Sequence, residues 1–224
     1  MPFARRQFLS ALPGLLCLAG IRQVRGELSP LDAVRVYVVP LDDFPEELAA
    51  GLARALQEDL GLRVKASIRL PPLAVPYLPG TQQLIAEEIM LRGAAASSRL
   101  PEAIPETYRV FLAARDINGR SANFRFLFSS HNRALNCSVV SLARLLDYAA
   151  GRPQLNPRAL MRLAKISKRA LGEMVFGWQR SADPEDLMYS PLMSLADLDR
   201  LGLVHRETTP DAKPPESVQT DKAI

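Results

Sequence analysis

The sequence predicts an α/β fold in a single domain. Short β-branched runs alternate with helical spacing of leucines in the first half of the chain, and a long helix-forming stretch follows in the second half. With 224 residues, 48% of them hydrophobic and 23% charged, the chain can bury one sizeable core. We therefore expect one folded domain over residues 27–203.

The first strand and helix are expected between residues 34 and 60. The β-branched run at 34–39 is typical of a strand, and Pro40 ends it. Over 45–60, leucines recur every fourth residue, and Gly61 then supplies a stop signal. This pattern predicts a strand over 34–39 and a helix over 45–60.

A second strand and helix repeat this unit. Apolar residues alternate over 62–70, which predicts a strand, and helical spacing over 81–92 predicts a helix. The Asn118-Gly119 pair is a turn signal further along the chain. Three more strands are expected over 108–113, 123–128 and 136–142.

The last long element is a helix over 157–176. Pro157 suits the first turn of a helix, the stretch that follows is rich in Leu, Ala, Arg and Lys, and Gly177 ends it. Beyond it, the segment 204–224 is rich in proline and charge and nearly free of apolar residues towards its end. We expect this tail to be disordered.

The N-terminus over 1–26 is expected to be an export signal. Arg5 and Arg6 precede Phe-Leu and an apolar stretch over 11–21, which is too short to remain as a membrane span. The paired arginines favour the twin-arginine route to the periplasm or the outside of the cell. An ordinary secretory signal that happens to carry two arginines is the alternative.

The charge of the chain gives no support for a nucleic-acid partner. Four of the 28 Lys and Arg residues lie within the first 26 positions, and the rest balance the 24 Asp and Glu residues. After the signal, Cys137 is the one remaining thiol, so the domain has no internal disulfide. We expect Cys137 to be a small buried side chain.

Catalytic and metal-binding motifs are scarce. The two histidines, His131 and His205, do not stand in a His-Glu-x-x-His spacing, and each is expected to form ordinary hydrogen bonds. The sequence also lacks a glycine-rich phosphate loop, a Cys-x-x-Cys pair and a Gly-x-Ser-x-Gly elbow. We therefore expect no bound metal or cofactor.

One segment nevertheless resembles the archaemetzincin family of zinc metallopeptidases. Residues 170–188, ALGEMVFGWQRSADPEDLM, align without a gap to the family motif His-Glu-x-x-His-x-x-Gly-x-x-His-Cys-x4-Cys-x-Met. Gly177 takes the place of the glycine, and Met188 that of the methionine in the Met-turn. Upstream, residues 108–116, 123–128 and 139–145 resemble further segments of the family, so the likeness spans roughly residues 33–200.

The resemblance implies a metzincin-like fold, with a mixed twisted sheet packed on helices, a long active-site helix and a Met-turn. It also implies that the site is vestigial. In this alignment Ala170, Met174 and Arg180 replace the three zinc ligands, and Leu171 replaces the catalytic glutamate. Alanine and leucine have no donor atom, a thioether is a weak zinc ligand, and a guanidinium repels a cation.

The second zinc site of the family is replaced as well. Ser181 and Asp186 stand at its first two cysteine positions, and no later Cys-x-x-Cys follows. Arg180 either supplies positive charge in place of the metal or simply extends into solvent; both readings stay open at this point. Glu173 is expected to lie off the helix face shared by Ala170 and Met174.

Two functions follow from the resemblance. The preferred one is an inactive homologue that binds a peptide or protein in the cleft, because a metzincin holds its peptide as an extra strand and this pairing needs no zinc. The alternative is a hydrolase with a non-standard site. The strand expected to hold the peptide runs over 123–130, with the candidate residues Asn123, Phe124, Phe126, Phe128 and Ser129.

Overall fold

The computed structural model describes residues 33–121 and 124–206. The expected export signal over 1–26, the candidate residue Asn123 and the tail from 207 onward lie outside these ranges. Within the described part of the chain, no helix is both long and apolar enough to span a membrane.

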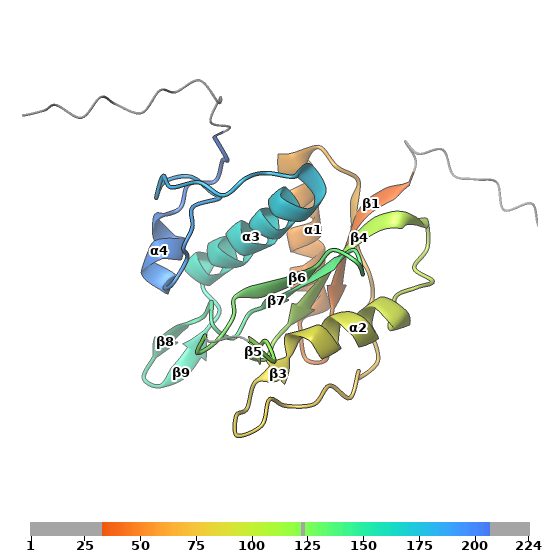
Figure 1. The fold of residues 1–224 in the computed structure, drawn as a ribbon, viewed down its shortest axis with the longest axis horizontal. Coiled ribbons are helices and arrows are strands. Elements are labelled where there is room, and N and C mark those ends of the chain that lie inside the picture. Colours follow the sequence, from red (N-terminus) through yellow and green to blue (C-terminus); the bar gives the residue numbers. More distant parts are fainter. Residues whose placement is uncertain (1–32, 122–123, 207–224) are drawn as a thin grey trace, which may run out of the picture.

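A five-stranded mixed sheet forms the centre of the molecule, in the order β2-β1-β4-β7-β6 (Figure 1). The first four strands of this order run parallel, and β6 pairs antiparallel with β7. Strand β6 is therefore the edge of the sheet. The strands are β1 (Val34–Pro40), β2 (Val64–Ala66), β4 (Ala103–Ala113), β6 (Ser129–Asn132) and β7 (Cys137–Ser141).

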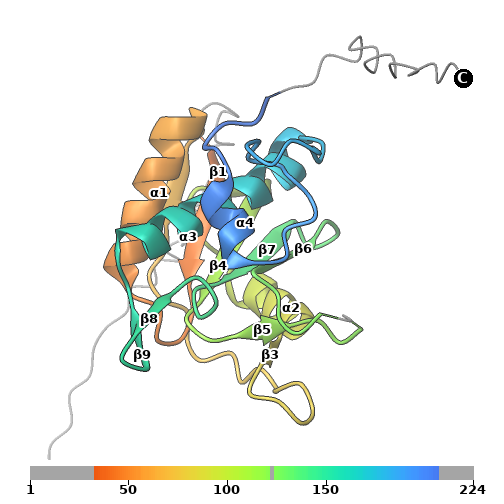
Figure 2. The ribbon, with the colours of Figure 1, turned by 90° about the vertical axis from the view of Figure 1, so that its left-hand side faces the viewer.

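Helices cover both faces of this sheet. Helices α1 (Glu46–Leu60) and α3 (Pro157–Leu171) pack on one face and α2 (Ala86–Ala96) on the other, as the two views show (Figure 1, Figure 2). Successive side chains of a strand point to opposite faces. In β1 the side chains accordingly divide between two buried apolar clusters: Val36 and Val38 join the cluster of α1 and α3, and Tyr37 and Val39 join that of α2.

Helix α3 leads into the region that resembles the peptidase motif. Pro157 occupies its first turn, and the side chain of Asn156 caps it by accepting a hydrogen bond from the backbone N–H of Ala159 at 2.9 Å. The helix continues as a single π turn, η1 (Gly172–Phe176), and ends at Gly177 with a φ of 71°. That left-handed conformation favours glycine and explains why the chain turns there.

Smaller elements complete the fold. Arg162 of α3 is almost fully buried and binds Asp199 of α4 (Leu195–Arg200) through Nε and Oδ1 at 2.6 Å. Its Nη1 also lies 2.8 Å from Oδ1 of Asp147. The remaining short strands pair as β3 (Leu84–Ile85) with β5 (Ile117–Asn118) and β8 (Asp147–Ala149) with β9 (Arg152–Gln154).

The strands predicted over 34–39, 108–113 and 136–142 and the helices over 45–60 and 157–176 are confirmed, the last with a π turn at its end. Other boundaries were wrong. The strand expected over 62–70 shortens to β2 because Ile68 points into solvent, 79% exposed. The helix expected to start at residue 81 begins at Ala86, since the preceding residues pair as β3 with β5.

The turn expected at Asn118-Gly119 begins after Gly119, at Arg120, because Asn118 is a buried residue of strand β5. The strand expected over 123–128 does not form within the described residues, and the edge strand begins only at Ser129. The preceding segment makes one isolated bridge, between Leu127 and Ile117. Its backbone is held by side chains instead of a full ladder.

Candidate functional site

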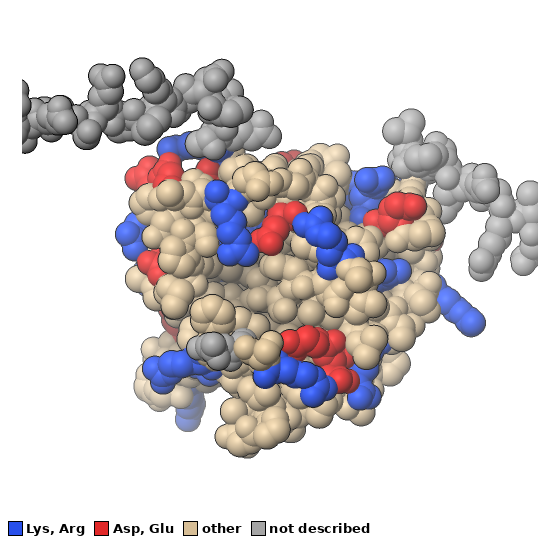
Figure 3. Space-filling model, viewed as in Figure 1, with Lys and Arg blue, Asp and Glu red and all other residues tan. Residues whose placement is uncertain are grey.

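A cleft of about 390 Å³ lies between the last turns of α3 and the chain that leads into β6. Figure 3 shows this face of the molecule hollowed, with basic and acidic side chains along both rims of the hollow. Three groups of residues line the cleft. They are 124–129 with His131 on the sheet side, Ile166, Arg169, Glu173 and Arg180 on the helix side, and 190–193 after the Met-turn.

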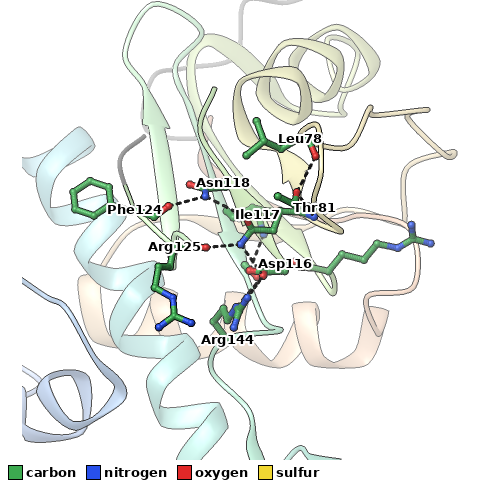
Figure 4. A network of polar contacts seen from close by, with 11 residues as sticks. Leu78, Thr81, Asp116, Ile117, Asn118, Phe124, Arg125 and Arg144 are labelled. Carbon is green, nitrogen blue, oxygen red and sulfur yellow. Dashed lines mark hydrogen bonds and ion pairs between the residues drawn. The ribbon is translucent and has the colours of Figure 1, made fainter. Parts of the chain in front are cut away.

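A polar network holds the sheet-side wall in place (Figure 4). The side-chain amide of Gln83 donates to the carbonyl of Arg125 at 2.8 Å and to Oδ2 of Asp116 at 2.9 Å. The amide of Asn118 donates to the carbonyl of Phe124 at 2.9 Å and to Oε1 of Gln83 at 3.1 Å. Because both amides are buried, these bonds fix the backbone of the wall without strand pairing.

Arg144 makes further contacts that stabilise the sheet-side wall of the cleft. Arg144 donates through Nε to Oδ2 of Asp116 at 2.8 Å, and its guanidinium lies 4.8 Å from the centroid of the Phe126 ring. Phe126 meets Phe128 edge to face, with ring centroids 5.1 Å apart. The aromatic side chains of the cleft are therefore fixed in orientation.

Three charged side chains from the helix side meet in the cleft. Nη2 of Arg180 lies 3.4 Å from Oε2 of Glu173, and Nη1 donates to the hydroxyl of Ser190 at 3.3 Å. Arg169 donates through Nη1 to the carbonyl of Leu187. Burial and the nearby charge of Arg180 lower the pKa of Arg169 to about 10, so it stays cationic at neutral pH.

His131 faces these charges from the sheet side. Its Nδ1 lies 2.6 Å from the hydroxyl of Ser138, which in turn contacts the hydroxyl of Tyr108. Burial is the main cause that lowers the pKa of His131, and the charges of Arg180 and Arg169 act in the same direction, while Glu173 opposes them. The imidazole is therefore neutral at pH 7.

The residues that the gapless alignment put at the zinc-ligand positions do not all line the cleft in the structure. Arg180 lines the cleft, and its side chain is also largely exposed to solvent. Ala170 and Leu171 are fully buried, and Leu171 and Met174 pack into the core shared by α1 and α3. None of those three lines the cleft, whereas Arg169 and Glu173 do.

The Met-turn position lies beside the end of α3. Met188 is buried, its backbone N–H donates to Oδ1 of Asp186 at 2.6 Å, and its carbonyl accepts from the N–H of Ser181 at 3.0 Å. The adjoining carbonyl of Leu187 accepts from Arg169. The segment around Met188 is thus hydrogen-bonded both to helix α3, through Arg169, and to the loop that follows Gly177, through Ser181.

Of the residues proposed to hold a peptide, Phe124, Phe126, Phe128 and Ser129 all line the cleft. The edge strand itself is β6, which starts at Ser129. Gln83, Asn118, Arg169 and His131 were missed as contributors to the site, because nothing in their local sequence distinguishes them. Their contribution depends on partners that are distant along the chain, such as the Gln83 contact with Arg125.

Three solved structures are similar to this fold, each over more than three quarters of the chain. An archaemetzincin from Methanopyrus kandleri matches with a TM-score of 0.57 and 22% identity, covering 78% of this chain and 90% of its own. A zinc-dependent peptidase from Methanocorpusculum labreanum matches with a TM-score of 0.64 and 19% identity, covering 77% and 96%. An archaemetzincin from Archaeoglobus fulgidus, complexed with malonate, gives 0.58 and 19%, covering 77% and 95%.

The chain has the archaemetzincin fold. The mixed sheet packed on helices that the sequence predicted is confirmed by these three likenesses. No protein-family model matches the sequence, and neither does any curated protein.

The archaemetzincin fold implies a zinc ion, and the residues of this cleft do not fit one. Zinc takes imidazole, thiolate or carboxylate ligands. The cleft lining offers one imidazole, that of His131, and one carboxylate, that of Glu173, which is paired with Arg180, beside three guanidinium groups. Across residues 33–121 and 124–206, no group of three or more His, Cys, Asp or Glu side chains could hold a metal ion.

Proposed function

We propose that this protein is an exported homologue of the archaemetzincins that has lost zinc-peptidase chemistry and binds peptides in the remaining cleft. The observation that carries the proposal is the composition of the cleft: arginines and a paired glutamate stand where a zinc peptidase needs ligands. Without zinc or a free carboxylate base, the site lacks both groups with which a zinc peptidase activates water near neutral pH.

The open edge of the sheet supports peptide binding by strand addition. The backbone N–H of Ser141 donates to the carbonyl of Phe128 at 2.9 Å. In an antiparallel pair such bonds alternate along the strand, so Ser130 bonds to β7 while the backbone groups of Ser129 and His131 face outward. These outward groups border the cleft and can pair with an extended chain.

A second candidate is a hydrolase that works without a metal. It is favoured by one observation, namely that the two titratable groups His131 and Glu173 line the same cleft. A neutral imidazole is a competent general base.

Two measurements on the purified exported protein test these candidates. Zinc content by elemental analysis and cleavage of a mixed peptide library address chemistry; we expect no zinc and no cleavage. Stoichiometric zinc with chelator-sensitive cleavage would overturn the proposal. Cleavage that persists in chelator and is lost in His131→Gln would favour the metal-independent hydrolase.

Strand addition is tested with a matched pair of variants. Ser129→Pro removes an outward N–H and should weaken binding of library peptides while leaving the ladder to β7 intact. Ser130→Pro removes an inward N–H and should instead lower the thermal midpoint. Equal peptide binding by wild type and a folded Ser129→Pro variant would exclude pairing at this edge.

A further inference from the structure

The side chains of α3 and η1 that line the cleft follow helical spacing. Ile166, Arg169 and Glu173 are three and four residues apart, which places them on one helix face. Ala170 and Met174 have the same spacing one position later and lie off the cleft. Arg169 and Glu173 therefore have the four-residue spacing of the first two ligands in the family motif, on the helix face that lines the cleft.

The π turn explains the difference of one position. The backbone N–H of Gly177 donates to the carbonyl of Gly172, an i to i+5 bond that accommodates one more residue than an α-helical turn. Counted from Arg169, Gly177 follows by eight residues and Arg180 by eleven. The family motif has seven and ten, so a single extra residue in η1 restores the match.

Charge in the cleft is strongly unbalanced. Its lining contains three arginines, Arg125, Arg169 and Arg180, against one glutamate. Glu173 contacts Arg180, and among the described residues no carboxylate lies within ion-pair distance of Arg169. Arg169 thus brings a poorly solvated cation to the cleft with only one hydrogen bond to the rest of the described chain, from Nη1 to the carbonyl of Leu187.

Apolar groups surround this cationic centre. Phe124 and Met193 both line the cleft and are 55% and 60% exposed, whereas Ile166, which also lines it, is buried. A ligand that carries both a negative charge and an apolar group would complement this cleft. The charge would pair with the arginines, and the apolar group would cover the exposed Phe124 and Met193 side chains. Inorganic anions satisfy only the first of these requirements.

We infer that Arg169 and Arg180, which line the cleft from before and after the π turn, bind a carboxylate of the peptide that occupies it, with an apolar side chain of that peptide against Phe124 and Met193. This inference rests on the proposed peptide-binding function and names its ligand class. The carboxylate belongs either to the peptide C-terminus or to an acidic side chain, and both would meet the same two guanidinium groups.

Three synthetic peptides separate these cases. The first is an acetylated, amidated apolar hexapeptide without charge, the second is the same sequence with a free C-terminus, and the third is the amide with its last residue replaced by Glu. Titration calorimetry with the full exported chain should show the second or the third binding roughly 10- to 100-fold tighter than the first, as a charge-assisted pair of bonds gives. A preference for the second assigns the C-terminus, and a preference for the third assigns an acidic side chain.

Arginine variants locate the effect. Arg169→Met should abolish the preference for the charged peptide over the neutral amide. Because Arg169 also binds the carbonyl of Leu187, Arg180→Gln serves as a second variant; its side chain is 62% exposed, and it should reduce the preference without loss of folding. Arg54→Gln, at an exposed site on α1, is the matched charge control and should change nothing.

The outcomes distinguish the two proposals. Equal binding of all three peptides by wild type would overturn the carboxylate site and leave the peptide-binding function standing. A preference that persists in both arginine variants would also overturn the site. No binding of any of the three would count against the peptide-binding function itself.

Discussion

The carboxylate of Asp186 lies 3.0 Å from Nδ1 of His205, and both side chains are shielded from solvent. The ring of Trp178 sits beside His205, with centroids 5.2 Å apart, and Trp178 in turn covers Gly172. Asp186 stands at a position that the resemblance assigns to a cysteine of the second zinc site. The contact between Asp186 and His205 thus joins the loop after Gly177 to the last described residues of the domain.

Asp186→Ala should lower the free energy of unfolding by about 2–4 kcal/mol. The carboxylate accepts hydrogen bonds from the backbone N–H groups of Met188 and Arg206 as well as facing His205, and its removal leaves buried donors without a partner. Denaturant unfolding measures the loss. Asp43→Ala is the control, because Asp43 is 81% exposed and should change stability by less than about 0.5 kcal/mol.

Gly172→Ala should destabilise the fold by about 1–3 kcal/mol, because a Cβ there would lie 2.2 Å from Cε3 of Trp178. Gly51→Ala is the matched comparison within α1. No atom lies within 4 Å of a Cβ at that position, so the substitution should raise stability by about 0.5–1 kcal/mol. Changes of the same sign in both variants would contradict the close packing of Trp178 on the π turn.

Stability should fall as the pH is lowered from 7.5 to 5.5. Burial lowers the pKa of folded His131 below its usual value, with Arg169, Arg180 and Glu173 as the charges that face it. Between the folded and unfolded pKa values the unfolded chain binds more protons, so stability present above about pH 6.5 is lost below it, at up to about 1.4 kcal/mol per pH unit.

His131→Gln removes this titrating group. Thermal midpoints measured across the same pH range should therefore change less in the variant than in wild type. All other titratable groups are the same in both proteins, so their contributions cancel in the comparison. Parallel pH profiles would show that His131 is not the group responsible.

Zinc binding can be engineered only with the helix face that lines the cleft. The set Arg169→His, Glu173→His and Arg180→His should bind zinc, since it places three imidazoles around one volume. The set Ala170→His, Met174→His and Arg180→His should bind little and lose stability, because Ala170 has no exposed surface. Elemental analysis and unfolding curves distinguish the two sets. Zinc bound by the second set but not by the first would show that Ala170 and Met174, and not Arg169 and Glu173, face the site.

Replacing Arg5 and Arg6 with Lys should retain the precursor in the cytoplasm, because the twin-arginine receptor reads the arginine pair. Cell fractionation followed by immunoblotting measures the distribution. Export of the variant at the wild-type level would assign the protein to the general secretory route.

The sequence by itself determined the main elements of the fold and showed that the family motif His-Glu-x-x-His is missing. Local patterns were sufficient for this: β-branched residues over 34–39, leucines at helical spacing over 45–60, and Gly177 at the end of the last long helix. The chain has two histidines, His131 and His205, and they do not stand in that spacing, so the loss of the motif could be read directly.

The tertiary structure alone decided which side chains meet in the cleft. A π turn cannot be read from residue spacing, and the cleft is lined by Arg169 and Glu173 instead of Ala170 and Met174. The wall over 124–128 looked like a strand because of its alternating phenylalanines, yet its backbone bonds to the amides of Gln83 and Asn118. These contacts join residues far apart in the chain, and the strand propensity of a short segment does not depend on such distant partners.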